Sequence, residues 1–271
     1  MGDLMGRTNR SLLDKIVLIT GASSGLGEQI AYQAASEKAI VILAARRRER
    51  LEQIERRCRE LSGRPAYSYR LDVGSPEQIA AVVPDILARM GAVDVLVNNA
   101  GFGFFAEALA TPQSLANEMF KVNVLGLIQI TKLIAADMKK RGAGHIINIA
   151  SQASKMATPK SAVYAATKFA VRGYSNALRL ELKPFGIYVT TVNIGPMQTD
   201  FFIHADPSGS YLEKIDRWVL DPKVVAAKVT ACMLTDKREI NLPRIMEIGA
   251  RLYLLFPRIG DFLAGGIFNR K

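Results

Sequence analysis

The sequence predicts an α/β protein with one doubly wound parallel sheet and helices on both of its faces. Short β-branched apolar runs alternate with amphipathic stretches from residue 15 to about residue 194. The runs are continuously apolar, which is typical of strands that are buried on both faces. No internal repeat and no Gly/Ser-rich linker interrupts the alternation. We therefore expect one domain over residues 1–271, with its core in residues 14–200.

Each predicted element follows from the period of its apolar residues. The predicted strands are 16–19, 39–44, 67–71, 93–97, 145–149 and 188–192. The predicted helices are 28–37, 47–61, a helix that opens at Ser75-Pro76-Glu77, 115–139, 162–185 and 222–234. Residues 197–221 mix aromatic and charged side chains, which predicts an excursion over the substrate side of the surface. In the tail, 241–271, only 244–256 has a helical pattern.

The composition excludes several classes of protein. Hydrophobic residues make up 49% of the chain, which excludes a disordered or low-complexity chain. The two cysteines, Cys58 and Cys232, cannot form a disulfide framework, and the sequence has no cluster of metal ligands, so we expect no metal. The polar start and the lack of a long apolar run predict neither a secretory signal nor a spanning helix. We expect a cytoplasmic protein.

The chain is strongly basic, with 36 Lys and Arg against 25 Asp and Glu and a net charge of +11. Such a charge suits a nucleic acid, an anionic membrane or a phosphorylated small molecule. We expect no nucleic acid, because the sequence has no stacking or base-reading motif. The tail 241–271 combines apolar residues with arginines and could make a peripheral membrane contact. The favoured interpretation is that it packs on its own domain or on a sister subunit.

A glycine-rich turn from Thr20 to Gly27 follows the first predicted strand and precedes the first helix. Three glycines at this spacing let the backbone turn sharply and approach a pyrophosphate, and the helix N-terminus offers N–H groups to the phosphates. The sequence of strand, turn and helix indicates a Rossmann-type dinucleotide-binding fold. The predicted cofactor contacts in the turn are Gly21, Ser23, Ser24, Gly25, Leu26 and Gly27.

The end of the second predicted strand distinguishes NADP(H) from NAD(H). An acidic residue there usually binds the ribose hydroxyls of NAD, whereas this sequence has Arg46 and Arg47. At about 4 Å, the contrast between an Arg that attracts a ribose phosphate and an Asp that repels it is roughly a few kcal/mol. We therefore predict NADP(H), with Arg46 as the main contact and Arg47 and Ser23 as helpers. The alternative is that the arginines only solvate the start of a helix.

Tyr164 and Lys168 are four residues apart and share one face of a predicted helix. A phenol titrates at about pH 10, and a neighbouring ammonium group favours the phenolate and lowers the pKa of the tyrosine. Ser151 lies thirteen residues before Tyr164, at the carboxyl end of a predicted strand. Open α/β sheets bind their ligands at that end. These residue types therefore suit proton transfer beside a bound ligand.

The chain resembles the short-chain dehydrogenase/reductase family over about residues 14–200. The resemblance rests on the glycine turn, Leu71-Asp72-Val73, Asn98-Asn99-Ala100-Gly101, Asn123, Ser151, Tyr164 with Lys168, and Gly195-Pro196 with Thr199. It implies that Tyr164 is the general acid and base and that Ser151 binds the substrate oxygen. It also implies that Lys168 assists Tyr164 and holds the nicotinamide ribose, and that Asn123 holds a water for proton return.

Further cofactor contacts are implied by the same resemblance. They are Asp72 and Val73 at the adenine, Asn99, Ala100 and Gly101 along the cofactor, Gly195, and Thr199 at the carboxamide or pyrophosphate. Alternatives remain for three residues: Asp72 could cap a turn, Asn123 could be a satisfied core amide, and Thr199 could cap a helix. Ile194 stands where the family often has Pro, which puts the path of the following loop in question.

Taken together, the residues and the resemblance predict an NADPH-dependent oxidoreductase that interconverts a carbonyl and a secondary alcohol. The expected pocket is apolar, which favours a small hydrophobic substrate. Its candidate lining residues, of which about half should face the pocket, are Phe102, Phe104, Phe105, Met156, Phe201, Phe202, Tyr211 and Trp218. The alternative is a catalytically idle NADP-binding regulator or scaffold of the same fold. The resemblance also implies a homodimer or homotetramer.

Overall fold

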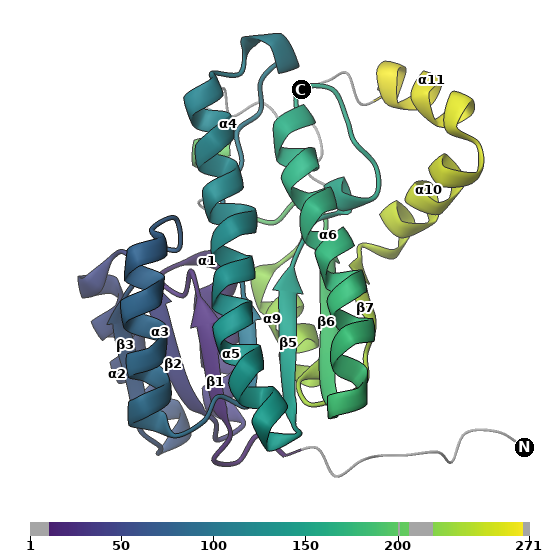
Figure 1. Cartoon of the computed structure of the whole chain (residues 1–271). Helices are drawn as coiled ribbons and strands as arrows, with labels where there is room; N and C mark the ends of the chain where they lie inside the picture. The colour runs from purple at the N-terminus through teal and green to yellow at the C-terminus, as the bar shows by residue number, and fades with distance from the viewer. Residues whose placement is uncertain (1–10, 200, 206–218, 268–271) are drawn as a thin grey trace, which may run out of the picture.

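A parallel sheet of seven strands forms the centre of the protein (Figure 1). The computed structural model describes residues 11–199, 201–205 and 219–267, without the side chains of residues 203, 204 and 263–267. The strands are β1 (Ile16–Thr20), β2 (Ile40–Ala45), β3 (Ala66–Arg70), β4 (Val95–Asn98), β5 (Gly144–Ile149), β6 (Ile187–Ile194) and β7 (Glu239–Leu242). The main helices are α1 (Gly25–Ser36), α2 (Arg48–Ser62), α3 (Pro76–Met90), α4 (Gln113–Phe120), α5 (Leu127–Arg141), α6 (Ala162–Leu182), α7 (Phe201–Ala205), α9 (Pro222–Cys232), α10 (Arg244–Leu255) and α11 (Pro257–Ile267).

The strand order, β3-β2-β1-β4-β5-β6-β7, is that of a doubly wound sheet. The direction of winding reverses between β1 and β4, so the carboxyl ends of these two strands form the crevice where such sheets bind ligands. The predicted Rossmann-type α/β fold is therefore confirmed. All neighbouring strands are parallel.

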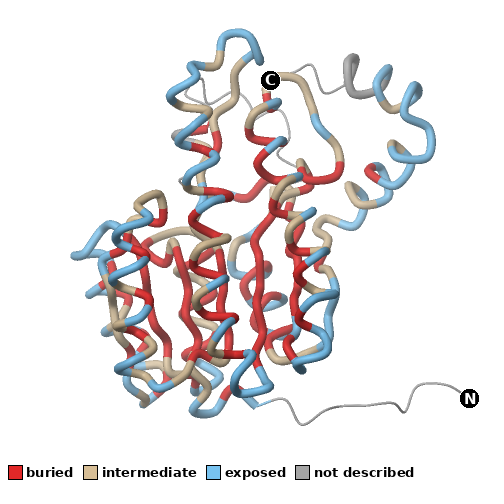
Figure 2. The backbone as a smooth tube through the Cα atoms, in the orientation of Figure 1, coloured by how far each residue is buried: buried red, intermediate tan, exposed pale blue. Residues whose placement is uncertain are grey.

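Helices cover both faces of the sheet, and the strands are buried between them (Figure 2). Along β1, Val17 and Ile19 enter the core that lies under α1, α2 and α9. Leu18, between them, enters the opposite core under α3, α5 and α6. Because successive strand residues point to opposite faces, a strand with helices on both sides must be apolar at every position. This is the physical origin of the unbroken apolar runs in the sequence.

The six predicted strands are confirmed to within three residues at each end, and a seventh was missed. β7 spans only Glu239–Leu242, and Ile240 is its one buried residue. It pairs with β6, where Ile194 lies opposite Leu242. A four-residue strand at the sheet edge with two polar side chains carries no recognisable alternation, so its sequence resembled a loop.

The predicted helix 115–139 is interrupted by a π-helical segment, η2 (Lys121–Gly126), which joins α4 to α5. Gly126 lets this segment pack against the residues after β3, since a Cβ there would lie 1.9 Å from the carbonyl oxygen of Val73. Among the described helices, the stretch Gln113–Arg141 is long and apolar enough to cross a membrane, but half of its most apolar window is buried inside the domain. A core helix of an α/β protein has the same composition.

The tail forms a helical hairpin, α10 and α11, that projects from the end of β7 (Figure 1, yellow). The predicted helix 244–256 corresponds to α10, whereas α11 was not predicted. Of the hairpin's described side chains only Ala250 is fully buried, and many of its large apolar side chains are exposed. The region 197–221 is described only in part, as α7 and a bridge that pairs Met197 with Leu220. Tyr211 and Trp218 lie outside the described residues.

Candidate active site

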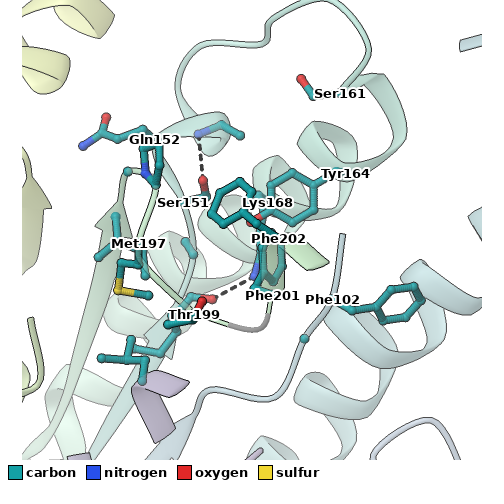
Figure 3. A pocket seen from close by; sticks show the side chains of 18 of the residues that line it. Phe102, Ser151, Gln152, Ser161, Tyr164, Lys168, Met197, Thr199, Phe201 and Phe202 are labelled. Carbon is teal, nitrogen blue, oxygen red and sulfur yellow. Dashed lines mark hydrogen bonds between the residues drawn. The ribbon is translucent and has the colours of Figure 1, made fainter. Parts of the chain in front are cut away.

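A cavity of about 1650 Å³ opens at the carboxyl ends of the strands (Figure 3). Its walls come from the glycine turn, the segments that follow β2 to β6, and the hairpin of α10 and α11. Nearly all the predicted site residues line it. They are Gly21, Ser23, Ser24, Gly25, Leu26, Arg46, Arg47, Asp72, Val73, Asn99, Ala100, Gly101, Ser151, Tyr164, Lys168, Gly195 and Thr199. Gly27 and Asn123 do not line it.

The glycine turn adopts the conformation that its sequence predicts. Gly21 and Gly25 have φ values of 64° and 57°, in the left-handed region that glycine tolerates without strain. Gly27 does not line the cavity, and a Cβ on it would lie 2.5 Å from the carbonyl oxygen of Gly21. It lets α1 pack closely against the turn. The side chain of Asn99 fixes the turn from the other side by donating to the carbonyl oxygens of Thr20 (3.0 Å) and Gly21 (3.2 Å).

The first turn of α1 faces the cavity. Its N-cap residue, Ser24, makes no side-chain capping hydrogen bond. The Ser24 hydroxyl instead accepts a hydrogen bond of 2.6 Å from Arg47. Within the described residues no side chain therefore caps the first N–H groups of α1, and a helix N-terminus of this kind is suited to bind phosphate. This is the structural feature that fits a pyrophosphate.

The two arginines at the end of β2 differ in their contacts. Arg47 donates to the hydroxyl and the carbonyl oxygen of Ser23 at 3.2 and 3.3 Å, in addition to Ser24, so it is a tie across the glycine turn. Arg46 is exposed, lines the cavity, and makes no hydrogen bond or ion pair with any described residue. Its guanidinium is thus the one of the pair that is left to bind a ligand.

Asp72 serves as a turn residue and also lines the cavity. Its carboxylate accepts a hydrogen bond of 2.9 Å from the backbone N–H of Gly74. The predicted alternative, a capped turn, is therefore present in the structure, and Val73 lies beside it in the cavity wall. This turn positions both residues next to the end of β2.

Tyr164 and Lys168 lie one turn apart on α6, as predicted, and both are buried. The amine of Lys168 lies 5.7 Å from the centroid of the Tyr164 ring and donates to the carbonyl oxygen of Ile149 at 3.1 Å. Burial lowers the pKa of Lys168 to about 8. The ring of Tyr164 is fixed by Phe105, edge-on at 5.9 Å, and by Phe201 at 5.7 Å. A phenol and an amine are thus held together at the floor of the cavity.

Ser151 lies two residues after the end of β5 and lines the same cavity as Tyr164 and Lys168 (Figure 3). The Ser151 oxygen accepts a hydrogen bond of 3.1 Å from the backbone N–H of Ala153. An acceptor bond of this kind leaves the hydroxyl proton available for donation to a ligand. The geometry therefore suits a hydroxyl that donates to a substrate oxygen.

The side-chain amide of Asn123 is hydrogen bonded within the protein, and its predicted water-holding role stays a prediction. Its amide donates to the carbonyl oxygen of Phe102 (2.8 Å) and to the Thr167 hydroxyl (3.1 Å), and it accepts from the Phe102 N–H (3.0 Å). These three bonds use both N–H donors of the amide. Asn123 is therefore the satisfied core amide that the sequence left open as an alternative. It joins η2 to α6 and to the loop after β4.

Two predicted residues after β6, Gly195 and Thr199, contact the hairpin and the glycine turn, respectively. Thr199 packs against the glycine turn, since a Cβ on Gly25 would lie 3.4 Å from its side chain. Gly195 admits the hairpin, because a Cβ on it would lie 2.9 Å from Met246 and from Pro243. Ile194, which replaces the family's common Pro, continues β6 in its pairing with β7. The strand thus extends to the edge of the cavity.

The structure also identifies lining residues that the sequence did not. Of the eight predicted apolar residues, five line the cavity and Phe104 does not; the five are Phe102, Phe105, Met156, Phe201 and Phe202. The hairpin adds a second apolar wall, formed by Ile245, Met246, Ile248, Leu252, Tyr253, Phe256 and Ile259. The apolar spacing of the tail was visible in the sequence, but nothing in that spacing placed it opposite Tyr164.

Comparison with known proteins shows the class to which this chain belongs. The sequence model of the short chain dehydrogenase family matches residues 15–208. The chain is 35% identical over 233 residues to a dehydrogenase/reductase SDR family protein 7-like from Drosophila melanogaster, covering 83% of this chain and 72% of the relative. It is 31% identical over 263 residues to human 17-beta-hydroxysteroid dehydrogenase 13, covering 96% and 84% of the two chains. The chain is a member of the short-chain dehydrogenase/reductase family.

Solved structures agree with this assignment and differ in their cofactor. A short-chain dehydrogenase from Sphingobium yanoikuyae in complex with NADPH has a TM-score of 0.76 and 27% identity, with 89% of this chain and 95% of that chain covered. An NAD+-bound xylitol dehydrogenase has a TM-score of 0.77 and 27% identity, with 86% and 99% covered. These neighbours bind nicotinamide dinucleotides of both kinds, so the likeness in fold does not distinguish NAD(H) from NADP(H) for this chain.

Proposed function

We propose that this protein is an NADPH-dependent oxidoreductase that interconverts a carbonyl group and a secondary alcohol on a small hydrophobic substrate. The observation that carries the proposal is that Ser151, Tyr164 and Lys168 line the same cavity as the glycine turn. A cofactor with its phosphates at the turn would be held along Asn99 and Gly101, next to Tyr164. A Cβ on Gly101 would lie 3.0 Å from Asn123 and 3.6 Å from the amine of Lys168, so a glycine keeps this space open.

The chain's own residues would position the substrate and move a proton. When bound, the reduced nicotinamide supplies the hydride that adds to the carbonyl carbon and is itself oxidised. Ser151 donates a hydrogen bond to the carbonyl oxygen, which stabilises the negative charge that develops there. Tyr164 gives its phenolic proton to that oxygen, so the product is the alcohol and the tyrosine is left as phenolate. The ammonium group of Lys168 stabilises this phenolate until solvent returns the proton.

Arg46 is the reason to prefer NADP(H) over NAD(H). It lies at the end of β2 with its guanidinium exposed to the cavity, and no described carboxylate neutralises it. Arginine binds phosphate through charge-assisted hydrogen bonds, whereas an acidic residue at this place would repel a ribose phosphate. Several solved relatives are bound to NADP or NADPH, which supports the choice.

The lining of the cavity supports a hydrophobic substrate. The phenyl rings of Phe105, Phe201 and Phe202 form one contiguous cluster, with centroid distances of 6.1 and 5.2 Å, and Tyr164 packs against two of them. Aromatic walls with few polar groups bind apolar molecules and orient them through those few groups. The relative named 17-beta-hydroxysteroid dehydrogenase 13 is consistent with this class of substrate.

The test is turnover of NADPH with a panel of apolar ketones, measured by cofactor absorbance for the wild type, Tyr164→Phe and Tyr174→Phe. Loss of the proton donor should lower turnover by about a hundredfold or more while NADPH still binds. Tyr174 lies on the same helix but outside the cavity lining, so its variant should keep activity. Full activity of Tyr164→Phe would refute the assignment, and NADPH binding without turnover of any ketone would favour the idle regulator.

The cofactor preference is tested separately with Arg46→Ala. This change should lower kcat/KM for NADPH by about tenfold or more and leave that for NADH nearly unchanged, because only NADPH carries the ribose phosphate. Arg48→Ala is the matched control, since Arg48 is exposed but pairs with Glu52 at 3.0 Å and does not line the cavity. A wild-type enzyme that uses NADH as efficiently as NADPH would overturn this part of the proposal.

A further inference from the structure

The cavity that contains Ser151 and Tyr164 continues beyond the aromatic cluster along the hairpin of α10 and α11. Its far wall is apolar and includes Ile248, Leu252 and Phe256. Phe201, which packs against Tyr164, and Phe202, which packs against Phe201, line the same cavity as this wall. The apolar surface is thus continuous from the site of chemistry to the hairpin.

The cavity is also larger than one small ligand requires. Pockets for drug-sized molecules are typically about 300–1,000 Å³, whereas this cavity measures about 1650 Å³. A dinucleotide at the glycine turn therefore leaves space on the hairpin side. Because none of the described hairpin residues that line the cavity is charged, water is a poor occupant beside the hairpin.

The hairpin presents a particular face to the cavity. Leu252 lines the cavity and is 52% exposed, whereas Leu254, which is 57% exposed, does not line it. Two residues on a helix are separated by about 200° of rotation, so these leucines project to opposite sides of α10. Apolar residues on the cavity side of α10 can therefore be substituted separately from those on its outer side.

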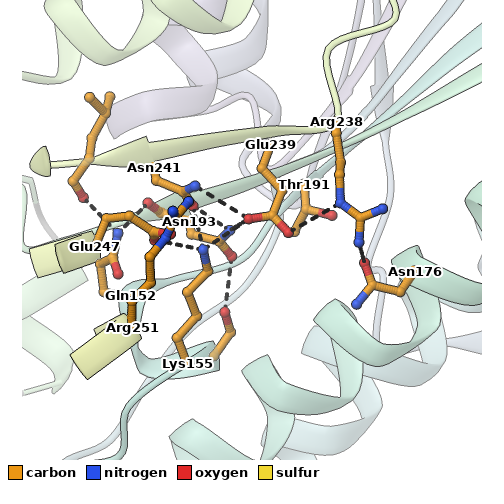
Figure 4. Close-up of polar contacts among 12 residues, drawn as sticks. Gln152, Lys155, Asn176, Thr191, Asn193, Arg238, Glu239, Asn241, Glu247 and Arg251 are labelled. Carbon is orange, nitrogen blue, oxygen red and sulfur yellow. Dashed lines mark hydrogen bonds and ion pairs between the residues drawn. The ribbon is translucent and has the colours of Figure 1, made fainter. Parts of the chain in front are cut away.

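A buried ion cluster holds the hairpin in this position (Figure 4). The amine of Lys155, which is 3% exposed, binds Glu239 of β7 at 2.9 Å, Asn241 at 2.9 Å and Glu247 of α10 at 2.6 Å. Lys155 follows Ser151 by four residues, at the end of the turn η3 (Gln152–Ser154). The cluster therefore connects the catalytic loop directly to α10, and the apolar wall stands at a fixed place relative to Ser151.

We propose that the cavity face of the hairpin is a second subsite that binds a hydrocarbon chain of the substrate while its carbonyl group lies at Tyr164. The substrate class is then a ketone or alcohol that carries an extended aliphatic chain, and this assignment rests on the proposed function. The occupant is the substrate itself, since the wall is continuous with the catalytic cavity. A membrane surface or a second copy of the chain would instead contact the outer face as well.

A series of 2-alkanones tests the subsite on the full chain. For the wild type, kcat/KM should rise by about threefold for each added methylene from 2-butanone to 2-decanone, as expected for burial of a CH₂ group. Leu252→Ser should lower kcat/KM for 2-decanone by about threefold or more relative to kcat/KM for 2-butanone. Leu254→Ser, with the same chemical change and a similar exposure, should leave the whole series unchanged.

A binding measurement keeps the subsite testable without turnover. The fluorescence of 11-(dansylamino)undecanoic acid, added to the protein with NADP, should report binding that Leu252→Ser weakens and Leu254→Ser does not. Failure of every ketone to react, together with this binding pattern, would refute the proposed function but support the subsite. Turnover of 2-butanone with a flat series and no probe binding would refute the subsite alone.

Two further outcomes would also overturn it. If both leucine variants weaken chain-length selectivity or probe binding equally, the two faces are not distinct. If both variants then no longer float with liposomes of phosphatidylcholine and phosphatidylserine, the hairpin is a membrane contact. If both variants instead change the oligomeric state measured by light scattering, the hairpin is an interface between copies of the chain.

Discussion

Replacement of Lys168 by methionine should remove one pH-dependent contribution to the free energy of unfolding and should also lower the activity. The amine of Lys168 is buried, its one hydrogen bond among the described contacts goes to the carbonyl oxygen of Ile149, and no described carboxylate pairs with it. Burial lowers the pKa of this lysine from 10.5 to about 8. The charged form of Lys168 therefore destabilises the folded state at neutral pH. We expect its charge to act in the reaction, by stabilising the phenolate of Tyr164.

The magnitude follows from the linkage between protonation and folding. Between the folded pKa of about 8 and the unfolded pKa of 10.5, the unfolded chain binds the extra proton, so stability increases with pH. From pH 7 to pH 9.5 this gain amounts to about 2 kcal/mol. Below pH 7 both states are protonated and the gain is absent. Lys168→Met lacks the group, so its stability should show no such gain from this position.

The assay is urea unfolding of the cofactor-free protein, followed by circular dichroism at several pH values between 7 and 9.5. The free energy of unfolding of the wild type should rise by about 2 kcal/mol relative to that of Lys168→Met over this range. The methionine also leaves the Ile149 carbonyl without its donor, but that loss is constant with pH and cancels in the comparison. Lys132→Met, at an exposed position, is the control and should run parallel to the wild type.

Parallel curves for the wild type and Lys168→Met would refute this reasoning, because they would show that Lys168 titrates in the same way in the folded and unfolded states. The same variant should also lose turnover, since the phenolate of Tyr164 would lack its neighbouring positive charge. A variant that kept full activity would show that this charge does not assist Tyr164.

Two further changes test the packing around the site. Gly27→Ala should destabilise the protein by about 1 to 3 kcal/mol, because the new Cβ would lie 2.5 Å from the Gly21 carbonyl oxygen. Gly173→Ala, whose Cβ would have no neighbour within 4 Å, should stabilise α6 by about 1 kcal/mol. Thermal unfolding measures both variants, and equal shifts of the same sign would contradict the close packing at Gly27. Lys155→Met should destabilise by about 2 to 3 kcal/mol, since two partly buried carboxylates lose their cation. In a double-mutant cycle by urea unfolding, Glu247→Gln should then cost less in the Lys155→Met background than in the wild type, and simple additivity would argue against the cluster.

The sequence predicted the sheet and the grouping of Ser151, Tyr164 and Lys168 at one cavity because each depends on a local signal. A strand covered on both faces is apolar throughout, so β1 and β5 were recognisable without knowledge of their neighbours. Tyr164 and Lys168 are one helical turn apart, and Ser151 lies just after a strand, so α6 and β5 bring them together once the sheet forms. The parallel order of strands then places their carboxyl ends at one edge.

Other roles depended on the number of contacts a side chain finds, which its residue type does not reveal. The residue type of Asn123 does not say which groups its amide contacts, and the structure shows that the amide binds Phe102 and Thr167. Arg46 and Arg47 are adjacent and chemically identical, yet only Arg47 turns back onto Ser23 and Ser24. The direction in which a side chain leaves the backbone decides between these roles, and the sequence records only the residue.

Only the tertiary structure brought the tail to the site. Lys155 meets Glu239 and Glu247 across 84 and 92 residues of sequence, and no spacing or period connects positions that far apart. Strand β7 has one buried residue, so its local pattern was too weak to predict, although it carries the hairpin to the cavity. Local periodicity determines which segments form strands and helices, whereas long-range ion pairs and edge strands form only after the core has brought the distant segments together.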